Sequence, residues 1–418
     1  MKQMHRQQKT ILWICHGSFL GGAAVSFFEI AKRLDRNRFR VVAILPGKGP
    51  LREWLQKENI ACRVIPLGVF YYGSFAKTFS MRNGLFFLAS IRNLLILSVN
   101  MIGNLLVLPW VILKEDPQII ILNSSTLFLS GLVAKAMKKK VVCHVREIYS
   151  TGKMRWLTRA LGGLIRYATD RVIVHSEFSK NDMSSIGVKN TVLLPIGFDL
   201  KRLSPPALSG RQLQAAADPG YPMVGFVGQL SYEKGWRTLV QAAFMLVKRL
   251  PGIRFLIVGG RPAKSGAEAS SDAILKGHHE YARFQGLVRE LKLTDFFSFA
   301  GPQDNVENYF SMMSCLTFTS IAPETFGRVI AEAMACQVPV VASCVGASPE
   351  IVRHGITGLL VKAQDPGALA RAIEEILTDP DQARAMGIAG RKRIEELYDI
   401  EKVLPRLEEV YFPPAARP

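Results

Sequence analysis

The chain has 418 residues, of which 49% are hydrophobic and 21% are charged, and this balance excludes a disordered protein and predicts two folded domains. Its formal net charge of +19 is concentrated in residues 1–200, which hold 28 Lys and Arg against 11 Asp and Glu, whereas residues 201–418 hold 25 against 23. A basic half indicates an anionic partner. We expect an anionic membrane surface and no nucleic acid, because the sequence has no recognition-helix pattern, RNA-binding aromatic signature or Cys/His finger.

The cysteines and the N-terminal segment indicate a cytoplasmic protein. All six cysteines lie singly within apolar runs rather than at paired spacings, so neither a disulfide framework nor a metal site is expected. The apolar run 11–15 follows three basic residues but is shorter than the core of a signal peptide, and we interpret it as a first buried strand.

Short apolar runs alternate with helical patterns along the first half, as in a parallel sheet with crossover helices. Strands are expected at 10–15, 41–46, 61–66, 117–122, 140–145, 170–175 and 190–194. Helices are expected at 23–34, 126–138, 154–168 and 178–186.

The segment 84–113 is unusually apolar, with 21 uncharged residues in a row from 93 to 113. A helix of that length would be about 31 Å long and could span a bilayer, but one crossing would put neighbouring strands of one sheet on opposite sides. Asn104 and two further asparagines share one face of such a helix. Two interpretations stay open, burial in the core or contact with the membrane interface, and the basic flanking residues favour the second.

A Pro-rich and Gln/Ala-rich stretch, 204–220, is typical of a linker, and the alternation restarts after it. Strands there are expected at 223–228, 253–258, 295–299, 315–319 and 338–342, and helices at 235–249, 281–292, 325–336, 367–377 and 381–410. We therefore predict an α/β protein with two doubly wound, Rossmann-like domains, 1–203 and 221–395, and a C-terminal helix and tail, 396–418, that crosses back to the first domain. Ligands of such sheets bind at the carboxyl ends of the strands, so a cleft between the domains is the expected site.

The stretch 322–336 carries the clearest chemical pattern. An apolar strand leads into a loop and then a helix, whose first amides have no partner within the helix and suit a pyrophosphate. Gly327 lets a ligand approach the backbone closely. Glu324, just outside the helix, can accept hydrogen bonds from sugar hydroxyls, and Glu332, two turns in, can hold ribose hydroxyls.

Here the sequence resembles the retaining glycosyltransferases of family 4, which have the two-domain GT-B architecture. The hallmark of that family is a Glu, seven residues and a second Glu, as from Glu324 to Glu332. Further stretches similar to the family occur in the expected order at 21–22, 194–199, 228–235, 345–352 and 355–361. The likeness covers nearly the whole chain except 67–113 and about 261–280.

The resemblance implies roles for single residues. Lys234 would neutralise the diphosphate of the donor, where charge develops as the glycosidic bond breaks. His144, at the end of a strand, would position the donor sugar, so that His144, Glu324 and Lys234 form the expected catalytic set. Arg146 and Glu147 would either bind an acceptor or pair with each other.

The remaining expected donor-binding residues are Gly21, Gly22, Gln229, Phe326, Gly327, Arg328 and Glu332. The family usually has Arg at the position of Gln229, so part of the phosphate clamp lacks charge there. Arg328, where the family commonly has an apolar residue, either restores that charge or is a solvated arginine on the helix face.

The reaction that the resemblance implies is transfer of a sugar, with retention of anomeric configuration, from a UDP- or GDP-sugar donor to a hydroxyl of a glycan or lipid-linked acceptor. Cell-surface polysaccharide synthesis at the cytoplasmic face of the membrane, without a metal or other cofactor, fits this expectation. Two alternatives stay open: a nucleotide-sugar epimerase of the same fold, and a non-catalytic sugar-binding scaffold.

Overall fold

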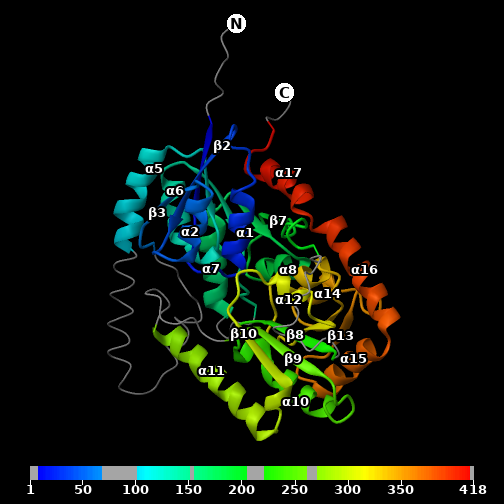
Figure 1. Ribbon diagram of the computed structural model, residues 1–418. Helices are drawn as coiled ribbons and strands as arrows, with labels where there is room; N and C mark the ends of the chain where they lie inside the picture. The colour runs from blue at the N-terminus through cyan, green and yellow to red at the C-terminus, as the bar shows by residue number, and fades with distance from the viewer. Residues whose placement is uncertain (1–7, 68–100, 151–154, 205–220, 261–270, 415–418) are drawn as a thin grey trace, which may run out of the picture. The chain divides into compact units, whose positions relative to one another are not determined.

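The computed structural model describes residues 8–67, 101–150, 155–204, 221–260 and 271–414 (Figure 1). The chain forms two compact units: unit 1 consists of residues 1–196 and 403–418, and unit 2 of residues 197–402. The expected linker 204–220 lies outside the described residues apart from Ser204. The chain passes between the units twice, once after Ile196 and once after Lys402.

Unit 1 is built on a parallel sheet of seven strands in the order β3-β2-β1-β4-β5-β6-β7. The strands are β1 Lys9–Ile14, β2 Phe39–Leu45, β3 Ala61–Val64, β4 Ile119–Leu122, β5 Lys140–His144, β6 Arg171–Val174 and β7 Thr191–Leu193. The strand order reverses between β1 and β4, so loops leave the sheet in opposite directions at that point. Such a switch point is where doubly wound sheets bind ligands.

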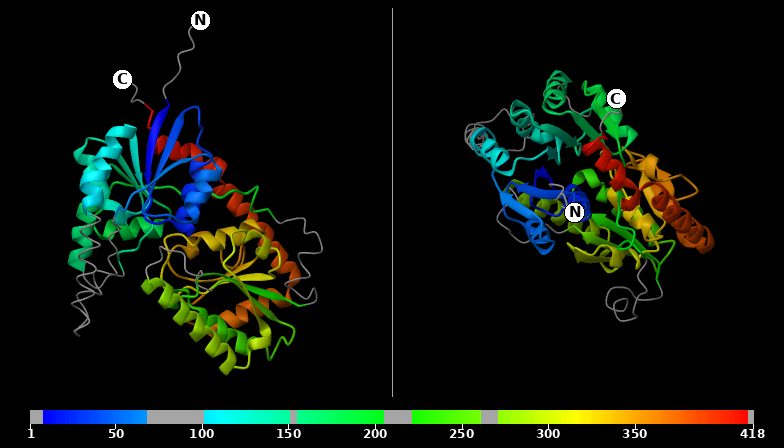
Figure 2. Two further views of the ribbon diagram at one scale, coloured as in Figure 1. Left: turned by 60° about the vertical axis from the view of Figure 1, so that its left-hand side comes forward. Right: turned by 90° about the horizontal axis from the view of Figure 1, so that it is seen from above.

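Helices cover both faces of this sheet (Figures 1 and 2). They are α1 Gly22–Ala31, α2 Pro50–Lys57, the π-helix η1 Gly103–Val107, α5 Leu108–Glu115, the 3₁₀ turn η2 Ser125–Leu127, α6 Phe128–Ala136, α7 Arg155–Ala168, α8 Glu177–Ser185 and α17 Ile400–Tyr411. Side chains of a strand alternate between faces. Leu12 and Ile14 therefore pack with α5 and α6, whereas Trp13 packs on Phe27 of α1 and Tyr411 of α17.

Unit 2 is built on a second parallel sheet, of six strands in the order β10-β9-β8-β11-β12-β13. The strands are β8 Met223–Gly228, β9 Arg254–Gly259, β10 Phe297–Gly301, β11 Cys315–Phe318, β12 Val340–Ser343 and β13 Leu359–Val361. The helices are η3 Tyr232–Lys234, α10 Trp236–Leu246, α11 Ser271–Glu290, η4 Thr294–Phe296, α12 Glu307–Phe310, α13 Arg328–Ala335, α14 Ser348–Ile351, α15 Pro366–Thr378 and α16 Pro380–Leu397. Its switch point lies between β8 and β11.

The predicted fold class, two Rossmann-like α/β domains with parallel sheets, is confirmed. One strand was not expected, and one expected helix is wrong. The strand β13 was not expected, since it has only three residues and follows a turn. The expected helix 381–410 is two helices, because the backbone around Asp399 pairs with Phe198: the amide of Phe198 donates to the carbonyl of Tyr398 at 2.8 Å, and the amide of Ile400 donates to the carbonyl of Phe198 at 3.0 Å.

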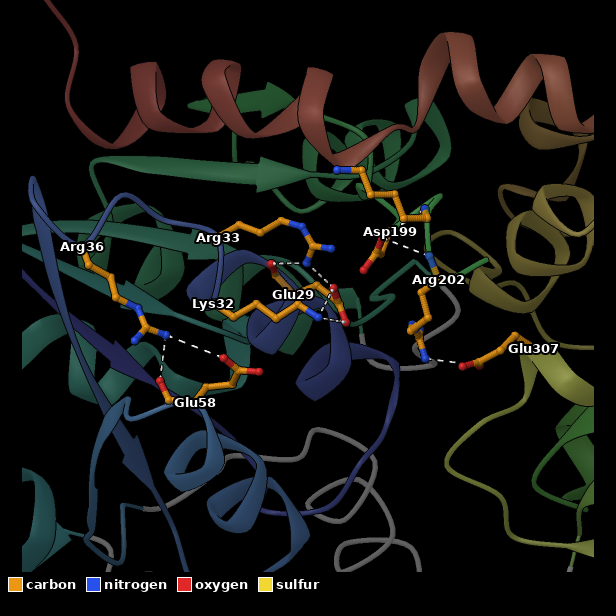
Figure 3. A network of polar contacts seen from close by, with 9 residues as sticks. Glu29, Lys32, Arg33, Arg36, Glu58, Asp199, Arg202 and Glu307 are labelled. Atoms are coloured by element: carbon orange, nitrogen blue, oxygen red, sulfur yellow. Dashed lines mark hydrogen bonds and ion pairs between the residues drawn. The ribbon is translucent and has the colours of Figure 1, made fainter. Parts of the chain in front are cut away.

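Polar side chains fix some of these elements internally (Figure 3). On α1, the buried carboxylate of Glu29 accepts from Lys32 at 3.1 Å and also pairs with Arg33. In unit 2, Arg202 pairs with Glu307 of α12 at 3.3 Å. These ion pairs hold segments in place within each unit and leave the two switch points to other residues.

No helix in the described parts of the chain combines the length and apolar character that crossing a bilayer requires. Of the apolar segment 84–113, residues 84–100 lie outside the described residues. The rest is helical: residues 101 and 102, η1 and the first part of α5.

Candidate active site

The loops that follow β8 and β11 are joined at the switch point of unit 2. The amide of Ile321 donates to the carbonyl of Glu233 at 2.8 Å, and the hydroxyl of Thr319 donates to the carbonyl of Lys234 at 2.8 Å. Gly235 has φ 66°, and a Cβ there would lie 1.9 Å from the carbonyl oxygen of Thr319. Only glycine fits this contact, so the two loops form one fixed support for the side chains on them.

Two of the expected catalytic residues meet on this support. Nζ of Lys234 lies 2.5 Å from Oε1 of Glu324, and the two side chains are 35% and 26% exposed. The ammonium also lies over the ring of Phe318, 5.8 Å from its centre. The pair is therefore oriented by its surroundings and yet open to solvent on one side, so an entering anion can compete for the lysine.

The backbone beside Glu324 is held by a third loop, which follows β12. Gly346 has φ 56°, and a Cβ on it would lie 2.4 Å from the amide nitrogen of Glu324. The amide of Ala347 donates to the carbonyl of Glu324 at 3.1 Å. Beyond Glu324, Gly327 with φ 86° precedes the first turn of α13, which has no side-chain cap. The amides of that turn are suited to an anion.

Arg328 and Glu332 bind each other on successive turns of α13. Nη2 of Arg328 donates to Oε1 of Glu332 at 2.8 Å, and both side chains are about nine-tenths buried, with exposures of 13% and 12%. The guanidinium also lies over the ring of Phe198 at 4.8 Å. Both residues expected to bind the donor are thus engaged with protein groups, and Arg328 is not a solvated surface arginine.

Phe326 and Gln229 occupy opposite kinds of position. Gln229 is exposed directly after β8, where a ligand can reach it. Phe326 is 3% exposed and packs against Phe198 and Tyr398, with ring centres 5.9 Å and 5.3 Å away. The side chain of Phe326 therefore anchors the loop in the core of unit 2. Only the backbone of Phe326 could contact a donor.

In unit 1, the loop after β1 and the start of α1 form the switch point with β4. Gly21 is the residue before α1 and supplies no side-chain cap, and both Gly21 and Gly22 are exposed. A Cβ on Gly21 would meet open space. The side-chain amide of Asn123, directly after β4, donates to the carbonyl of Ala23 at 3.1 Å. Asn123 thereby joins the start of α1 to the end of β4.

A carboxylate after β5 is tightly held at the same edge. Glu147 accepts from the hydroxyl of Ser124 at 2.5 Å, from the hydroxyl and amide of Ser125 at 2.5 and 3.1 Å, and from the amide of Arg146 at 3.2 Å. Ser124 and Ser125 are buried. Nη2 of Arg146 donates to the side-chain oxygen of Asn123 at 3.3 Å. Glu147 therefore orders the loops after β4 and β5, and Arg146 lies at their surface.

His16, directly after Cys15 at the end of β1, lies in this cluster. Burial lowers the pKa of His16, the carboxylate of Glu147 opposes that shift, and the charge of Arg146 adds to it. Its Nδ1 is buried and has no hydrogen-bond partner among the described residues. The ring is half-buried, and its lowered pKa favours the neutral imidazole beside Arg146.

The structure gives His144 a different setting from the one expected. The ring is 1% exposed, and its Nε2 shares a hydrogen bond of 2.7 Å with the hydroxyl of Tyr411 on α17. Burial lowers the pKa of His144 well below its usual range, and Arg146 and His175 lower it further. This burial separates the ring from any ligand in the present conformation, so contact of His144 with the donor sugar stays a prediction while its bond to Tyr411 has a clear structural role.

Sequence reasoning did not single out His16, Asn123, Ser124 or Ser125. A signal was present, because the polar run 123–125 follows a fully apolar strand and His16 follows another. Polar residues directly after parallel strands lie at the ligand-binding edge of the sheet. The signal is weak because His16 and the run 123–125 are far apart in the sequence.

Two family models match this chain. The model for glycosyl transferases group 1 matches residues 213–393, and the model for glycosyltransferase family 4 matches residues 20–202. Together they cover the switch point of unit 2 and most of unit 1, whereas β1 and His16 precede the matched residues.

Similar proteins and structures agree with these matches. The D-inositol 3-phosphate glycosyltransferase of Nocardia farcinica is 34% identical over 200 residues, which are 47% of this chain and 42% of that protein, so the match spans less than half of the relative's length. Anabaena Alr3699/HepE in complex with UDP and glucose aligns with a TM-score of 0.77 and 21% identity over 96% of this chain and 99% of that one. Sucrose-phosphate synthase of Thermosynechococcus elongatus aligns with a TM-score of 0.74 and 25% identity over 97% and 98% of the two chains. The chain therefore belongs to the group 1, family 4 glycosyltransferases and has their two-domain GT-B fold.

Proposed function

We propose that this protein is a retaining glycosyltransferase that moves a sugar from a UDP- or GDP-sugar to a hydroxyl of a glycan or lipid-linked acceptor. The observation that carries the proposal is the half-exposed pair of Lys234 and Glu324, 2.5 Å apart, beside the uncapped start of α13. This edge of unit 2 offers one cation and several amides to a diphosphate, and a carboxylate to sugar hydroxyls.

Donor binding exchanges the partner of Lys234. Without a ligand, the ammonium is paired with Glu324. An entering diphosphate carries more negative charge than one carboxylate, and it also accepts from the amides of α13, so it takes over the lysine. Glu324 is then free to accept hydrogen bonds from hydroxyls of the donor sugar. A carboxylate that is still paired with Lys234 would accept them less well.

The transfer itself breaks the bond between the anomeric carbon and the diphosphate oxygen. Lys234 and the helix amides stabilise the charge that develops on the leaving diphosphate. The acceptor oxygen forms its bond on the same face, and its proton passes to the departing phosphate. Retention follows because entry and departure share one face, and no covalent enzyme intermediate is required.

Charge neutralisation by Lys234 and the amides makes a metal unnecessary in this proposal. The expected result is full activity in the presence of EDTA. A loss of activity in EDTA that added Mg²⁺ or Mn²⁺ restores would contradict this part of the proposal.

The acceptor is assigned to the edge of unit 1. Arg146 offers a cation beside His16, and the loops after β4 and β5 are fixed by Glu147. The net positive charge of residues 1–200 supports an acceptor with phosphate groups, as in a lipid-linked glycan at the cytoplasmic face of a membrane. Cell-surface polysaccharide synthesis is the process that such an acceptor would serve.

Transfer assays with each donor class test the proposal, followed by NMR of the anomeric proton in the product. UDP-glucose is the first donor to try, since the HepE structure holds UDP and glucose. We expect a product with the anomeric configuration of the donor. An inverted product would disprove the retaining mechanism, and a changed sugar released without an acceptor would indicate an epimerase.

A further inference from the structure

The helix from Met101 to Glu115 has one face in the core of unit 1. A Cβ on Gly103 would lie 2.3 Å from the carbonyl oxygen of Pro66, so the helix touches the chain that leaves β3. The hydroxyl of Ser130 on α6 donates to the side-chain oxygen of Asn104 at 2.6 Å. Buried apolar side chains of α5 complete this inner face, which fixes how the helix is rotated: Leu108, Val111, Ile112.

The opposite face of the same helix is apolar and exposed. Leu106 is 69% exposed and Leu113 is 73% exposed, and five further large apolar side chains on this face are more than a third exposed: Met101, Ile102, Leu105, Val107, Trp110. Large contiguous apolar patches on a protein surface mark sites of interaction. The two interpretations of the apolar segment therefore apply to different faces of its described part.

A basic group of residues lies at the C-terminal end of this helix. Arg40 and Arg63 both bind the buried carboxylate of Glu115, which leaves an excess of one positive charge. Lys139 binds Asp116, and Lys114 lies over the ring of Trp110 at 4.9 Å. Trp with a neighbouring cation is typical of side chains at a membrane interface.

A second helix of the same layer has the same character. α7 contains no acidic residue, and its exposed side chains include Arg155, Arg159 and Arg166 together with Trp156 and Tyr167, which are 67% and 75% exposed. Its inner face packs on the sheet through Leu161 and Ile165. α6 lies between α5 and α7 and contacts both (Figure 1).

We propose that the exposed faces of η1, α5 and α7 form a docking face for a membrane surface that contains anionic lipids. Apolar and aromatic side chains would enter the boundary between headgroups and acyl chains, and the arginines and lysines would bind lipid phosphates. One face of this helix packs in the core of unit 1, so its described part, residues 101–115, would lie in the interface and not span the bilayer. The inference deepens the proposed function by naming where a lipid-linked acceptor would be met, but the binding itself does not require turnover.

Charge distinguishes a membrane from a second copy of this chain as the occupant. A symmetric dimer would place the same face of both copies in one interface, which would then hold six arginines of α7 and no acidic residue of that helix. Like charges across an interface oppose association. Anionic headgroups complement the same arginines.

Vesicle flotation with the full chain tests the proposal. Vesicles of phosphatidylcholine and phosphatidylglycerol in equal parts are compared with vesicles of phosphatidylcholine alone. We expect binding to the anionic vesicles that weakens with salt. The double variant Leu106→Asp/Leu113→Asp should weaken it about tenfold or more, because it puts charge where apolar side chains enter the lipid. The double variant Arg155→Gln/Arg159→Gln should weaken binding to anionic vesicles and reduce its salt dependence.

The matched control is Ile388→Asp/Leu397→Asp, two exposed apolar residues of α16 in unit 2, 55% and 43% exposed. It should bind vesicles as the wild type does. Equal binding of all variants, or no binding by the wild type, would overturn the proposal. A dimer in light scattering that Leu106→Asp/Leu113→Asp dissociates, without vesicle binding, would assign the face to a second copy.

The activity is measured separately on a short water-soluble acceptor. Leu106→Asp/Leu113→Asp should retain it, whereas Lys234→Ala should lose it and still bind vesicles. The vesicle assay and the activity assay therefore distinguish a failure of the membrane-docking proposal from a failure of the proposed glycosyltransferase function.

Discussion

The two sheet edges of this protein place polar side chains at the same topological position but in different ways. In unit 2, the pair of Lys234 and Glu324, which we propose binds the donor, is partly exposed and rests on backbone contacts that only glycine permits. In unit 1, the central carboxylate of Glu147 is bound by four donors from neighbouring loops. The first arrangement can change partners when a ligand enters, whereas the second fixes the loops that a ligand would meet.

The largest effect that separates the two edges is expected from Glu324→Ala. The proposed function assigns Glu324 to the hydroxyls of the donor sugar, so removing its carboxylate should lower turnover about 10²–10³-fold while the protein stays folded. Initial rates and a thermal melt check both parts. Glu374→Ala, which removes only the surface ion pair with Arg249, is the matched control and should leave turnover unchanged. A fall of less than threefold, which corresponds to about 0.7 kcal/mol of activation free energy at most, would make Glu324 a structural residue like Glu147.

The variant Glu147→Gln should lower stability and leave nucleotide binding intact, which is the opposite of what we expect from Glu324→Ala. The amide group of Gln would turn a donor toward the serines and amides that now donate to Glu147, so the free energy of unfolding should fall by about 2–3 kcal/mol. Urea unfolding followed by circular dichroism measures this. Nucleotide binding at the edge of unit 2 should persist below the transition. Unchanged stability with lost turnover would instead make Glu147 a residue of the reaction.

The burial of His144 in unit 1 makes the stability of the protein depend on pH. The pKa of His144 is lowered in the folded protein, so between that value and its unfolded value of about 6.5 the unfolded chain binds more protons. Stability should therefore fall as the pH is lowered below about 6.5 and be fully present above it. His144→Gln should show a smaller fall, of the order of 1 kcal/mol less, in melts between about pH 7 and about pH 5. Parallel curves for both proteins would contradict the burial of a neutral His144.

The smallest effect is expected from Arg328→Leu. Arg328 is bound to Glu332 and lies over Phe198, so it is not available to replace the missing charge at Gln229. The donor Michaelis constant should rise less than about threefold. A rise comparable to that of Lys234→Ala would show that Arg328 leaves Glu332 and joins the phosphate clamp.

More of the candidate site could be predicted from the sequence at the sheet edge of unit 2 than at the sheet edge of unit 1, for a physical reason. Glu324, Gly327 and Glu332 lie on one loop and helix, so their spacing is legible in a single stretch. Lys234 follows a glycine-ended strand that pairs directly with the strand before that loop. The parallel order of strands in both units could likewise be expected from alternating apolar and helical runs.

The unit 1 edge depends on contacts between residues far apart in the chain. Asn123 reaches Ala23, and Glu147 reaches Ser124, through the strand order of the folded sheet. The hydrogen bond between His144 and Tyr411 joins residues 267 positions apart, and no sequence pattern around either residue predicts it. The role expected of His144 came from the family resemblance and from its place at the end of a strand. That Tyr411 of α17 covers the ring depends on the tertiary structure and is not visible in the sequence.

The most direct test of the central claim is calorimetric titration of UDP and of GDP, without metal, into the wild-type protein and into Lys234→Ala. We expect one nucleotide to bind the wild type and the variant to bind it about 10- to 100-fold more weakly, because a charge-assisted contact to the diphosphate is lost. Equal affinity in both proteins, or no binding by a folded wild type, would contradict the assignment of the Lys234–Glu324 edge as the donor site.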